Sequence, residues 1–169
     1  MRILGIDPGL ARTGYGIIDQ KDEETLLLDY GTLTTEPEIS IGERLSGLKL
    51  QFTTLLETFH PEHLAIERLF FSQNVQTATV VGMACGVLFA SAHEGGLPIF
   101  EYTPLQVKLA LTGYGRATKQ QIQAMVKSLL KLASLPKPDD AADAVAIAIC
   151  HAHSFPTLNL IAKAEHVHS

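Results

Sequence analysis

The sequence contains no tryptophan and only two cysteines, Cys85 and Cys150, among its 169 residues. Two cysteines in separate apolar stretches cannot form the disulfide framework that stabilises many small secreted domains, and they favour a reducing compartment. Long hydrophobic runs are also lacking, because the apolar part of the longest uncharged segment, 80–92, is shorter than the roughly 20 residues that span a bilayer. No basic and apolar targeting segment opens the chain. We therefore expect a cytoplasmic protein without a membrane segment.

The composition also lacks the features of a disordered chain. Hydrophobic residues make up 46% of the sequence and charged residues 18%, with only 8 prolines, which indicates a folded protein. A chain of this length buries roughly 70% of its surface on folding, which suffices for one core. We predict a single domain over 1–155. The segment 156–169 has a weak pattern and is expected to be a flexible C-terminal tail.

Acidic residues are missing from one long segment, although the net charge of the chain is −5. Eight of the 18 acidic residues lie between Asp19 and Glu43, whereas none lies between Tyr102 and Pro138. The acid-free segment carries these basic residues: Lys108, Arg116, Lys119, Lys127, Lys131 and Lys137. Because a polyanion contacts a local face of a protein rather than its average charge, this segment is predicted to bind phosphates.

The order of the expected elements predicts the fold. Strands at 2–7, 14–19 and 25–35 form an antiparallel meander, and a helix at 41–59 begins with the capping box of Ser40 and Glu43. The remaining elements are a strand at 63–69, a helix at 76–93, a strand at 98–102, a short helix at 104–111, a helix capped by Thr118 and Gln121, and a last helix at about 139–153. This order predicts an α/β, ribonuclease H-like fold, with a five-stranded mixed sheet flanked by helices. A doubly wound nucleotide-binding fold is disfavoured, because the turn DPGLARTGYG leads into a strand instead of a helix.

Several carboxylates stand where secondary structure alone does not explain them. Asp7 ends the first strand, where Asp-Pro-Gly can also be simple turn chemistry. Glu67 interrupts an apolar strand, although it could face solvent there. Asp140 and Asp143 are three residues apart and share one face of the last helix, whose first turn also favours acidic caps.

These carboxylates can meet only if the first and fourth strands are neighbours in the sheet. In that case, their mutual repulsion is costly without cations. Oxygen ligands without histidine or cysteine companions indicate Mg²⁺ or Mn²⁺ rather than zinc, and none of the 7 histidines is expected to be a ligand. Two such ions are the apparatus for in-line attack on a phosphodiester.

Four segments in order, LGIDPGLARTGYGII, AIERLFFSQNVQTA, FEYTPLQVK and DDAADAVAIAICHAH, resemble the crossover junction endodeoxyribonuclease family (RuvC). The resemblance runs from about residue 2 to about residue 153. It implies a structure-selective endodeoxyribonuclease that resolves four-way (Holliday) DNA junctions in recombination and repair, leaving 5′-phosphate and 3′-hydroxyl ends. The catalytic, metal-binding carboxylates of the family fall on Asp7, Glu67, Asp140 and Asp143, with Asp139 as the alternative to Asp140.

The resemblance also implies a cofactor, partners and DNA contacts. The carboxylates would hold two Mg²⁺ per active site, for which Mn²⁺ can substitute. Symmetric nicking needs two sites related by a two-fold axis, so we expect a homodimer, in contact through the uncharged helix 76–93, and a branch-migration helicase complex as a partner. By position, Phe70 matches an aromatic wedge near the exchange point, and Lys108 and Lys119 match residues that hold the scissile phosphate region. Arg116, in a loop before a helix, can also fit against a phosphate.

Two other functions are weighed against this one. One half of an actin/hexokinase-type phosphotransferase also has a G-x-D-x-G loop after a strand, but that fold clamps its nucleotide between two halves and this chain has one. A catalytically silent module that only binds junctions is disfavoured by the complete set of carboxylates. ATP turnover without DNA would indicate the first alternative, and binding without cleavage the second.

Overall fold

The structure, a computed structural model, describes residues 1–22, 24–68 and 75–166. Its sheet consists of β1 (Arg2–Asp7), β2 (Arg12–Lys21), β3 (Glu24–Thr34), β4 (His63–Glu67) and β5 (Ile99–Tyr102). The strand order is β3-β2-β1-β4-β5. Strands β1, β2 and β3 pair antiparallel, whereas β4 is parallel to both β1 and β5. The predicted five-stranded mixed sheet is confirmed, and the first and fourth strands are neighbours.

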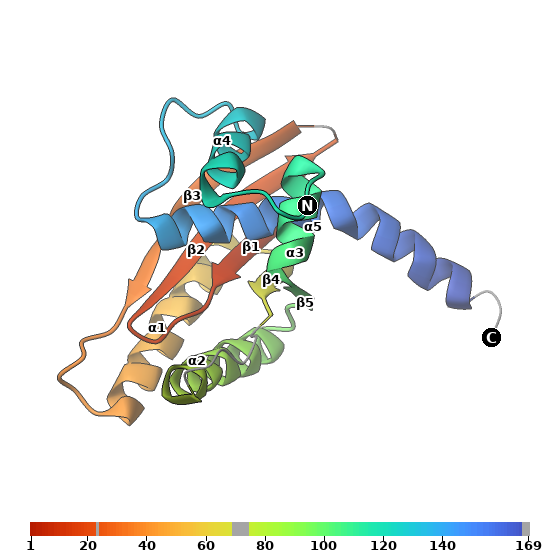
Figure 1. Cartoon of the computed structure of the whole chain (residues 1–169). Helices are drawn as coiled ribbons and strands as arrows, with labels where there is room; N and C mark the ends of the chain where they lie inside the picture. The colour runs from red at the N-terminus through yellow and green to blue at the C-terminus, as the bar shows by residue number, and fades with distance from the viewer. Residues whose placement is uncertain (23, 69–74, 167–169) are drawn as a thin grey trace.

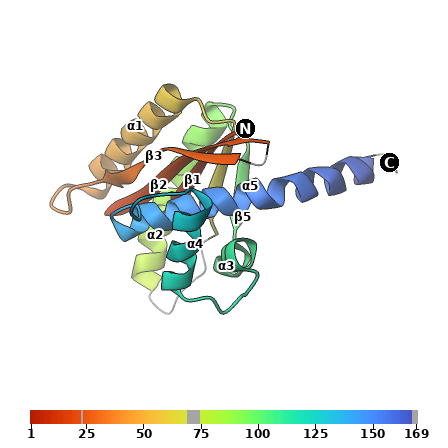
Figure 2. The same cartoon turned by 90° about the horizontal axis from the view of Figure 1, so that it is seen from above.

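Helices cover both faces of the sheet (Figures 1 and 2). Helices α1 (Ile41–Phe59) and α2 (Val75–Glu94) pack on one face, where Phe52 and Leu88 join a core with Leu4 and Ile66. Helices α3 (Pro104–Thr112), α4 (Lys119–Leu129) and α5 (Asp139–His166) pack on the other face. Among the described residues, every helix is too short or too polar to span a bilayer.

Capping boxes start three of these helices. In each box, the N-cap hydroxyl accepts from the main-chain N–H three residues on, whose side chain accepts from the N–H of the cap. The pairs are Ser40–Glu43 for α1, Thr103–Gln106 for α3 and Thr118–Gln121 for α4. The sequence analysis identified the first and third pairs, and both are confirmed. The pair before α3 makes that helix begin directly after β5, which places α3 beside the sheet edge.

Helix α5 lies across β1 and β2 and then extends past the sheet (Figures 1 and 2). The sequence pattern predicts an end near His153, which is wrong, because the helix continues to His166. Pro156 removes one main-chain hydrogen-bond donor but does not end the helix. Phe155 packs against His63, and the residues after Pro156 include good helix formers. Whether 156–169 is a flexible tail stays a prediction.

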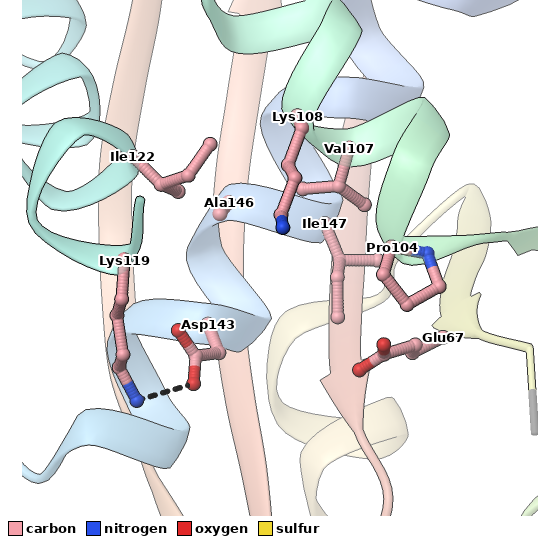
Figure 3. A pocket seen from close by; sticks show the side chains of 9 residues that line it. All are labelled: Glu67, Pro104, Val107, Lys108, Lys119, Ile122, Asp143, Ala146 and Ile147. Atoms are coloured by element: carbon pink, nitrogen blue, oxygen red, sulfur yellow. Dashed lines mark hydrogen bonds and ion pairs between the residues drawn. The ribbon is translucent and has the colours of Figure 1, made fainter. Parts of the chain in front are cut away.

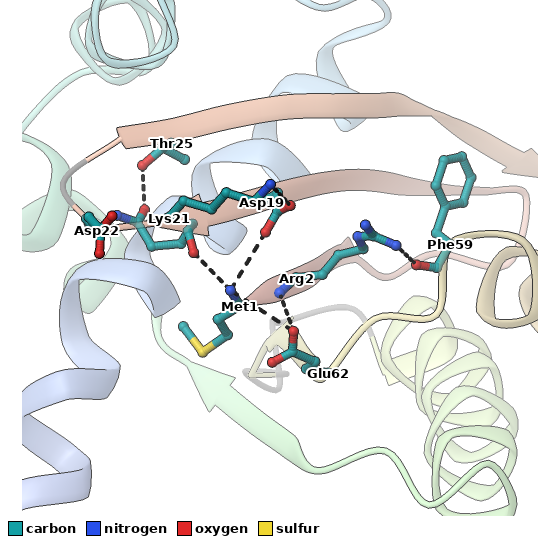
Figure 4. A network of polar contacts seen from close by, with 9 residues as sticks. Met1, Arg2, Asp19, Lys21, Asp22, Thr25, Phe59 and Glu62 are labelled. Carbon is teal, nitrogen blue, oxygen red and sulfur yellow. Dashed lines mark hydrogen bonds and ion pairs between the residues drawn. The ribbon is translucent and has the colours of Figure 1, made fainter.

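Polar contacts fix the amino end of β1 (Figure 4). The amino group of Met1 donates to the carbonyl oxygen of Gln20 at 2.8 Å, and the main-chain N–H of Arg2 donates to Oε1 of Glu62 at 3.1 Å. The guanidinium of Arg2 donates to the carbonyl oxygen of Phe59, the last residue of α1. These contacts tie the start of β1 to β2 and to the segment before β4. They support the register in which β1 pairs with both of its neighbours.

Candidate active site

The carboxyl ends of β1 and β4 bring Asp7 and Glu67 to one edge of the sheet. The two strands are parallel, and Ile6 of β1 is the Cα partner of Ile66 of β4. Asp7 and Glu67 follow directly after these partners. Ala65, two residues before Glu67, belongs to the core beneath α5, and residues two apart on a strand share a face. Both carboxyl groups therefore lie on the face of the sheet that α5 covers.

The first turns of α5 add Asp140 and Asp143 above this edge. The main chain of Asp140 rests on Gly14 of β2, which is the Cα partner of Asp7. Asp143, one turn further along α5, lines the same cavity as Glu67. The structure thus brings together the four carboxylates that the sequence analysis singled out.

Burial and mutual repulsion raise the pKa of the two strand carboxyl groups. The pKa of Asp7 rises from 3.8 to about 7, first through burial and then through the charges of Glu67, Asp143 and Asp140. The pKa of Glu67 is also raised, first by burial and then by the charge of Asp143, while a hydrogen bond with Asp7 acts in the opposite direction. This edge of the sheet therefore concentrates negative charge that its surroundings only partly neutralise.

Two basic side chains hold the helix carboxylates. Nζ of Lys119 lies 2.9 Å from Oδ2 of Asp143 and 3.2 Å from Oδ2 of Asp139, and the hydrogen bond to Asp143 is the main cause that raises the pKa of Lys119. Nη1 of Arg12 lies 3.2 Å from Oδ2 of Asp140. The sequence analysis missed Arg12. Its position just after the Asp-Pro-Gly turn, at the start of the strand that pairs with β1, is the signal that could have found it.

A cavity of about 250 Å³ opens between β4, α3, α4 and α5 (Figure 3). Figure 3 shows Lys119 and Asp143 pointing toward each other from α4 and α5, with Lys108 projecting from α3 into the same space. Glu67 supplies the second acidic group. The rest of the lining is apolar and consists of Pro104, Val107, Ile122, Ala146 and Ile147. A cavity with charges of both signs suits a phosphodiester together with the cations that it needs.

The carboxylates fit a hard divalent cation. Their oxygen atoms are the donors that Mg²⁺ and Mn²⁺ prefer, and the pKa values of Asp7 and Glu67 are raised first by burial and then by mutual repulsion, both of which a bound cation would offset. Within the described part of the chain, no three Asp, Glu, His or Cys side chains already stand as a metal-binding group. Lys119 and Arg12 hold the helix carboxylates instead. Binding a cation at all four carboxylates therefore requires these ion pairs to loosen.

Asp139 lies outside this group of carboxylates. Its side chain is 70% exposed and forms an ion pair with Lys119. The charge of Asp139 is not among those that raise the pKa of Asp7, whereas the charge of Asp140 is. Of the two adjacent acids, Asp140 is therefore the better placed for a cation shared with Asp7.

The predicted DNA-contacting residues lie at different distances from the cavity. Lys108 and Lys119 both line it. Arg116 is exposed in the segment between α3 and α4 and is not one of the lining residues. Phe70 lies outside the described residues.

Comparison with known proteins gives consistent matches over most of the chain. The family model described as crossover junction endodeoxyribonuclease RuvC matches residues 3–151. A protein of that name from Roseiflexus sp. (strain RS-1) is 50% identical over 160 residues, which cover 95% of each chain. Another, from Desulfitobacterium hafniense (strain DSM 10664 / DCB-2), is 52% identical over 159 residues, which cover 94% of this chain and 96% of the relative. The matched region contains all four carboxylates.

Solved structures agree with these sequence matches. Thermus thermophilus RuvC in complex with Holliday junction substrate superposes with a TM-score of 0.87 and 37% identity, covering 90% of this chain and 93% of the other. A second Thermus thermophilus RuvC structure gives a TM-score of 0.86 with 36% identity, covering 93% and 96%. The yeast mitochondrial Holliday junction resolvase, at 18% identity and a TM-score of 0.63 over 88% of this chain and 77% of its own, shares the fold.

Proposed function

The chain belongs to the crossover junction endodeoxyribonuclease (RuvC) family, and we propose that it cuts four-way DNA junctions with a centre of four carboxylates: Asp7, Glu67, Asp140 and Asp143. Membership makes the chain an endodeoxyribonuclease of DNA recombination and repair, and nucleases of this family depend on divalent metal ions. The observation that supports the assignment is the convergence of Asp7 and Glu67 from neighbouring parallel strands beneath the acidic first turns of α5.

The four carboxylates would hold two Mg²⁺, for which Mn²⁺ could substitute. Bound there, the ions would supply activation of a water and stabilisation of the leaving 3′-oxygen, as cleavage to 5′-phosphate and 3′-hydroxyl ends requires. The chain itself orients the carboxylates from two rigid layers, the sheet and α5. Lys108 and Lys119 reach the same cavity and are suited to hold the scissile phosphate there. The apolar walls of the cavity restrict water beside the reacting phosphate.

The DNA contacts extend from this cavity along the acid-free segment 102–138. Its basic residues lie on α3, on α4, on the link between them, which includes Arg116, and on the link from α4 to α5, which includes Lys131 and Lys137. Phosphate contacts from such residues position a duplex without reading its sequence, as junction selectivity by shape requires. Phe70 is the proposed aromatic wedge, on the strength of its place in the AIERLFF motif.

The active assembly is a homodimer in the cytoplasm, working with a branch-migration helicase complex. Two symmetric nicks require two centres related by a two-fold axis. The uncharged helix 76–93 is the expected dimer contact, but Ala84 and Leu88 on it cannot contribute, because both are fully buried in the core of this chain. Met83, 44% exposed, lies on the outward face of α2 instead. The free, buried thiols of Cys85 and Cys150 agree with a reducing compartment.

A gel assay on a synthetic four-way junction tests this function. We expect the purified protein to nick the junction symmetrically with Mg²⁺, to leave it intact in EDTA, and to leave a linear duplex of the same arms uncut. Asp7→Asn should abolish nicking while junction binding survives. The substitution removes the charge of a metal-binding carboxylate, and this carboxylate lies away from the basic surface that holds the DNA. Junction binding without nicking by the unsubstituted protein in Mg²⁺ or Mn²⁺ would instead identify a silent binding module.

A further inference from the structure

Three glycines lie where α5 meets the sheet. Gly5 of β1 and Gly16 of β2 are Cα partners, and Gly14 of β2 is the Cα partner of Asp7. A Cβ atom added to any of the three would collide with atoms of α5. The three residues are called the glycine platform below.

The platform touches the backbone of α5 directly. A Cβ atom at Gly14 would lie 2.0 Å from the carbonyl oxygen of Asp140, and one at Gly5 would lie 2.1 Å from the carbonyl oxygen of Ala144. Atoms of the helix backbone cannot rotate away as the end of a side chain can. One added methyl group at either position would therefore force α5 to move relative to the sheet.

We infer that Gly14 is a positioning residue of the active site, because it lets the main chain of Asp140 lie directly on β2 and so sets how far the carboxylates of α5 stand from those of the sheet. Asp7 and Glu67 move with the sheet, whereas Asp140 and Asp143 move with the helix. The height of α5 above β1 and β2 thus sets the separation between the two pairs. Among the platform glycines, Gly14 lies against Asp140, whose side chain is one of the four carboxylates of the site. The inference rests on the proposed function, since it assumes a cation shared between sheet and helix.

The sheet offers a control for replacing a packed glycine at a place away from α5. Gly31 of β3 has the ring of Tyr15 at 2.9 Å from the position of an added Cβ, and the atoms nearest to that position all belong to this ring. Gly31→Ala therefore introduces a milder crowding in the same sheet, away from α5, because the end of the Tyr15 side chain can shift whereas the backbone of α5 cannot. Gly31→Ala shows whether crowding within the sheet by itself lowers the affinity for metal, and Gly14→Ala is compared with it as a folded protein.

The experiment measures Mn²⁺ binding by isothermal titration calorimetry without DNA, on variants whose folding is verified by circular dichroism. We expect Gly14→Ala to bind Mn²⁺ roughly tenfold or more weakly, because disturbing the groups that orient metal ligands costs about 10–100-fold in affinity. Gly31→Ala should bind Mn²⁺ as the unsubstituted protein does. Junction binding in EDTA should be unchanged in both variants. A folded Gly14→Ala variant with unchanged Mn²⁺ affinity overturns the inference.

A second pair of variants covers the case in which Gly14→Ala does not fold. A Cβ atom at Gly16 would lie 2.4 Å from Cγ2 of Val145 and 2.9 Å from its Cα and N atoms. Val145→Ala removes the closer contact, so Gly16→Ala combined with Val145→Ala lifts α5 more gently. We expect this double variant to bind Mn²⁺ more weakly than Val145→Ala alone, and equal affinities overturn the inference.

Failure of the proposed metal site gives a different result. An unsubstituted protein that nicks junctions but binds no Mn²⁺ contradicts the metal assignment, not the platform. The platform is then tested by the nicking rate per bound junction, which Gly14→Ala should lower and Gly31→Ala should leave unchanged. Equal rates in the two variants overturn the inference in that case.

Discussion

Nζ of Lys119 lies 2.9 Å from Oδ2 of Asp143, so a basic side chain of α4 partly neutralises an acidic side chain of α5. The two side chains are 50% and 34% exposed, and exposed ion pairs of this kind add little to the stability of a fold. Their effect is local instead. Lys119 places positive charge beside carboxylates that would otherwise repel a DNA phosphate from the cavity.

Reversing the charge of Lys119 should therefore impair function more than reversing a lysine elsewhere. We expect Lys119→Glu to lower the cleavage rate or the junction affinity by roughly tenfold or more, since it removes a cation at the reacting phosphate. Lys21→Glu is the control, because Lys21 is 70% exposed and lies in the acidic half of the chain near Asp19. Equal losses in the two variants would mean that the basic segment is only a solvated surface.

Junction binding should weaken steeply as salt increases, in spite of the net charge of −5. Lysines that neutralise phosphates release the counterions bound to the DNA. The logarithm of the affinity therefore falls linearly with the logarithm of the salt concentration. Lys108→Gln should reduce that slope by about 1, whereas Lys21→Gln should leave it unchanged. Fluorescence anisotropy of a labelled junction across a salt series measures both slopes. A slope near zero for the unsubstituted protein contradicts this prediction.

Much of the fold is predictable because its signals are local. Ser40 and Glu43 mark the start of α1, and the turn after Asp7 separates two strands that are buried on both faces of the sheet. The end of α5 is not predictable in this way. Pro156 is a local signal against a helix, but Phe155 packs on rings from distant strands and the helix continues.

The candidate site also has residues with a local sequence signal and residues whose role depends on distant contacts. Asp7 and Glu67 are conspicuous in the sequence, since Asp7 ends an apolar strand and Glu67 interrupts one. The ion pair of Arg12 with Asp140 joins residues 128 positions apart, so the turn before Arg12 marks the residue but not its partner. Gly14 looks like any strand glycine until the distance between β2 and α5 is known. Contacts between layers depend on the packing of the whole domain and therefore escape a sequence pattern.

The raised pKa of Asp7 predicts how stability depends on pH without metal. Because this pKa rises from 3.8 to about 7 on folding, the folded protein holds the proton more tightly. The contribution of Asp7 to stability is therefore full below about pH 4 and is lost as the pH rises through about 7. Asp7→Asn removes the charge, so in EDTA it should be more stable than the unsubstituted protein by about 1–2 kcal/mol at pH 8 and by less at pH 5.

Urea unfolding in EDTA at the two pH values measures this difference. Asp29→Asn is the control, because Asp29 lies on β3 and contacts Tyr15 rather than the carboxylates of the site. Added Mg²⁺ should stabilise the unsubstituted protein at pH 8 and have a smaller effect on Asp7→Asn. A stability gain from Asp7→Asn that is smaller at pH 8 than at pH 5 contradicts the raised pKa of Asp7.

A buried histidine should give the opposite pH dependence. His151 of α5 is fully buried, with Nε2 at 2.8 Å from Nδ1 of His63 and Nδ1 at 2.7 Å from the hydroxyl of Tyr102. Burial, and to a lesser extent the charge of His63, lowers the pKa of His151 from 6.5 to about 3. As the pH falls through 6.5, the unfolded chain takes up a proton that the folded protein refuses, so the contribution of His151 to stability is lost toward acid.

His151→Phe should therefore cost stability at neutral pH and cost less in acid. At pH 7.5 the variant leaves the hydroxyl of Tyr102 and a ring nitrogen of His63 without their partner, a loss of about 1–3 kcal/mol. At pH 5 the unsubstituted protein has already lost part of the contribution of His151, so the difference between the two proteins should narrow. His153→Phe is the matched control, because His153 is exposed two residues further along the same helix. Urea unfolding of the three proteins at both pH values measures the effect, and a difference that stays constant between pH 7.5 and pH 5 would show that His151 is not held neutral by burial.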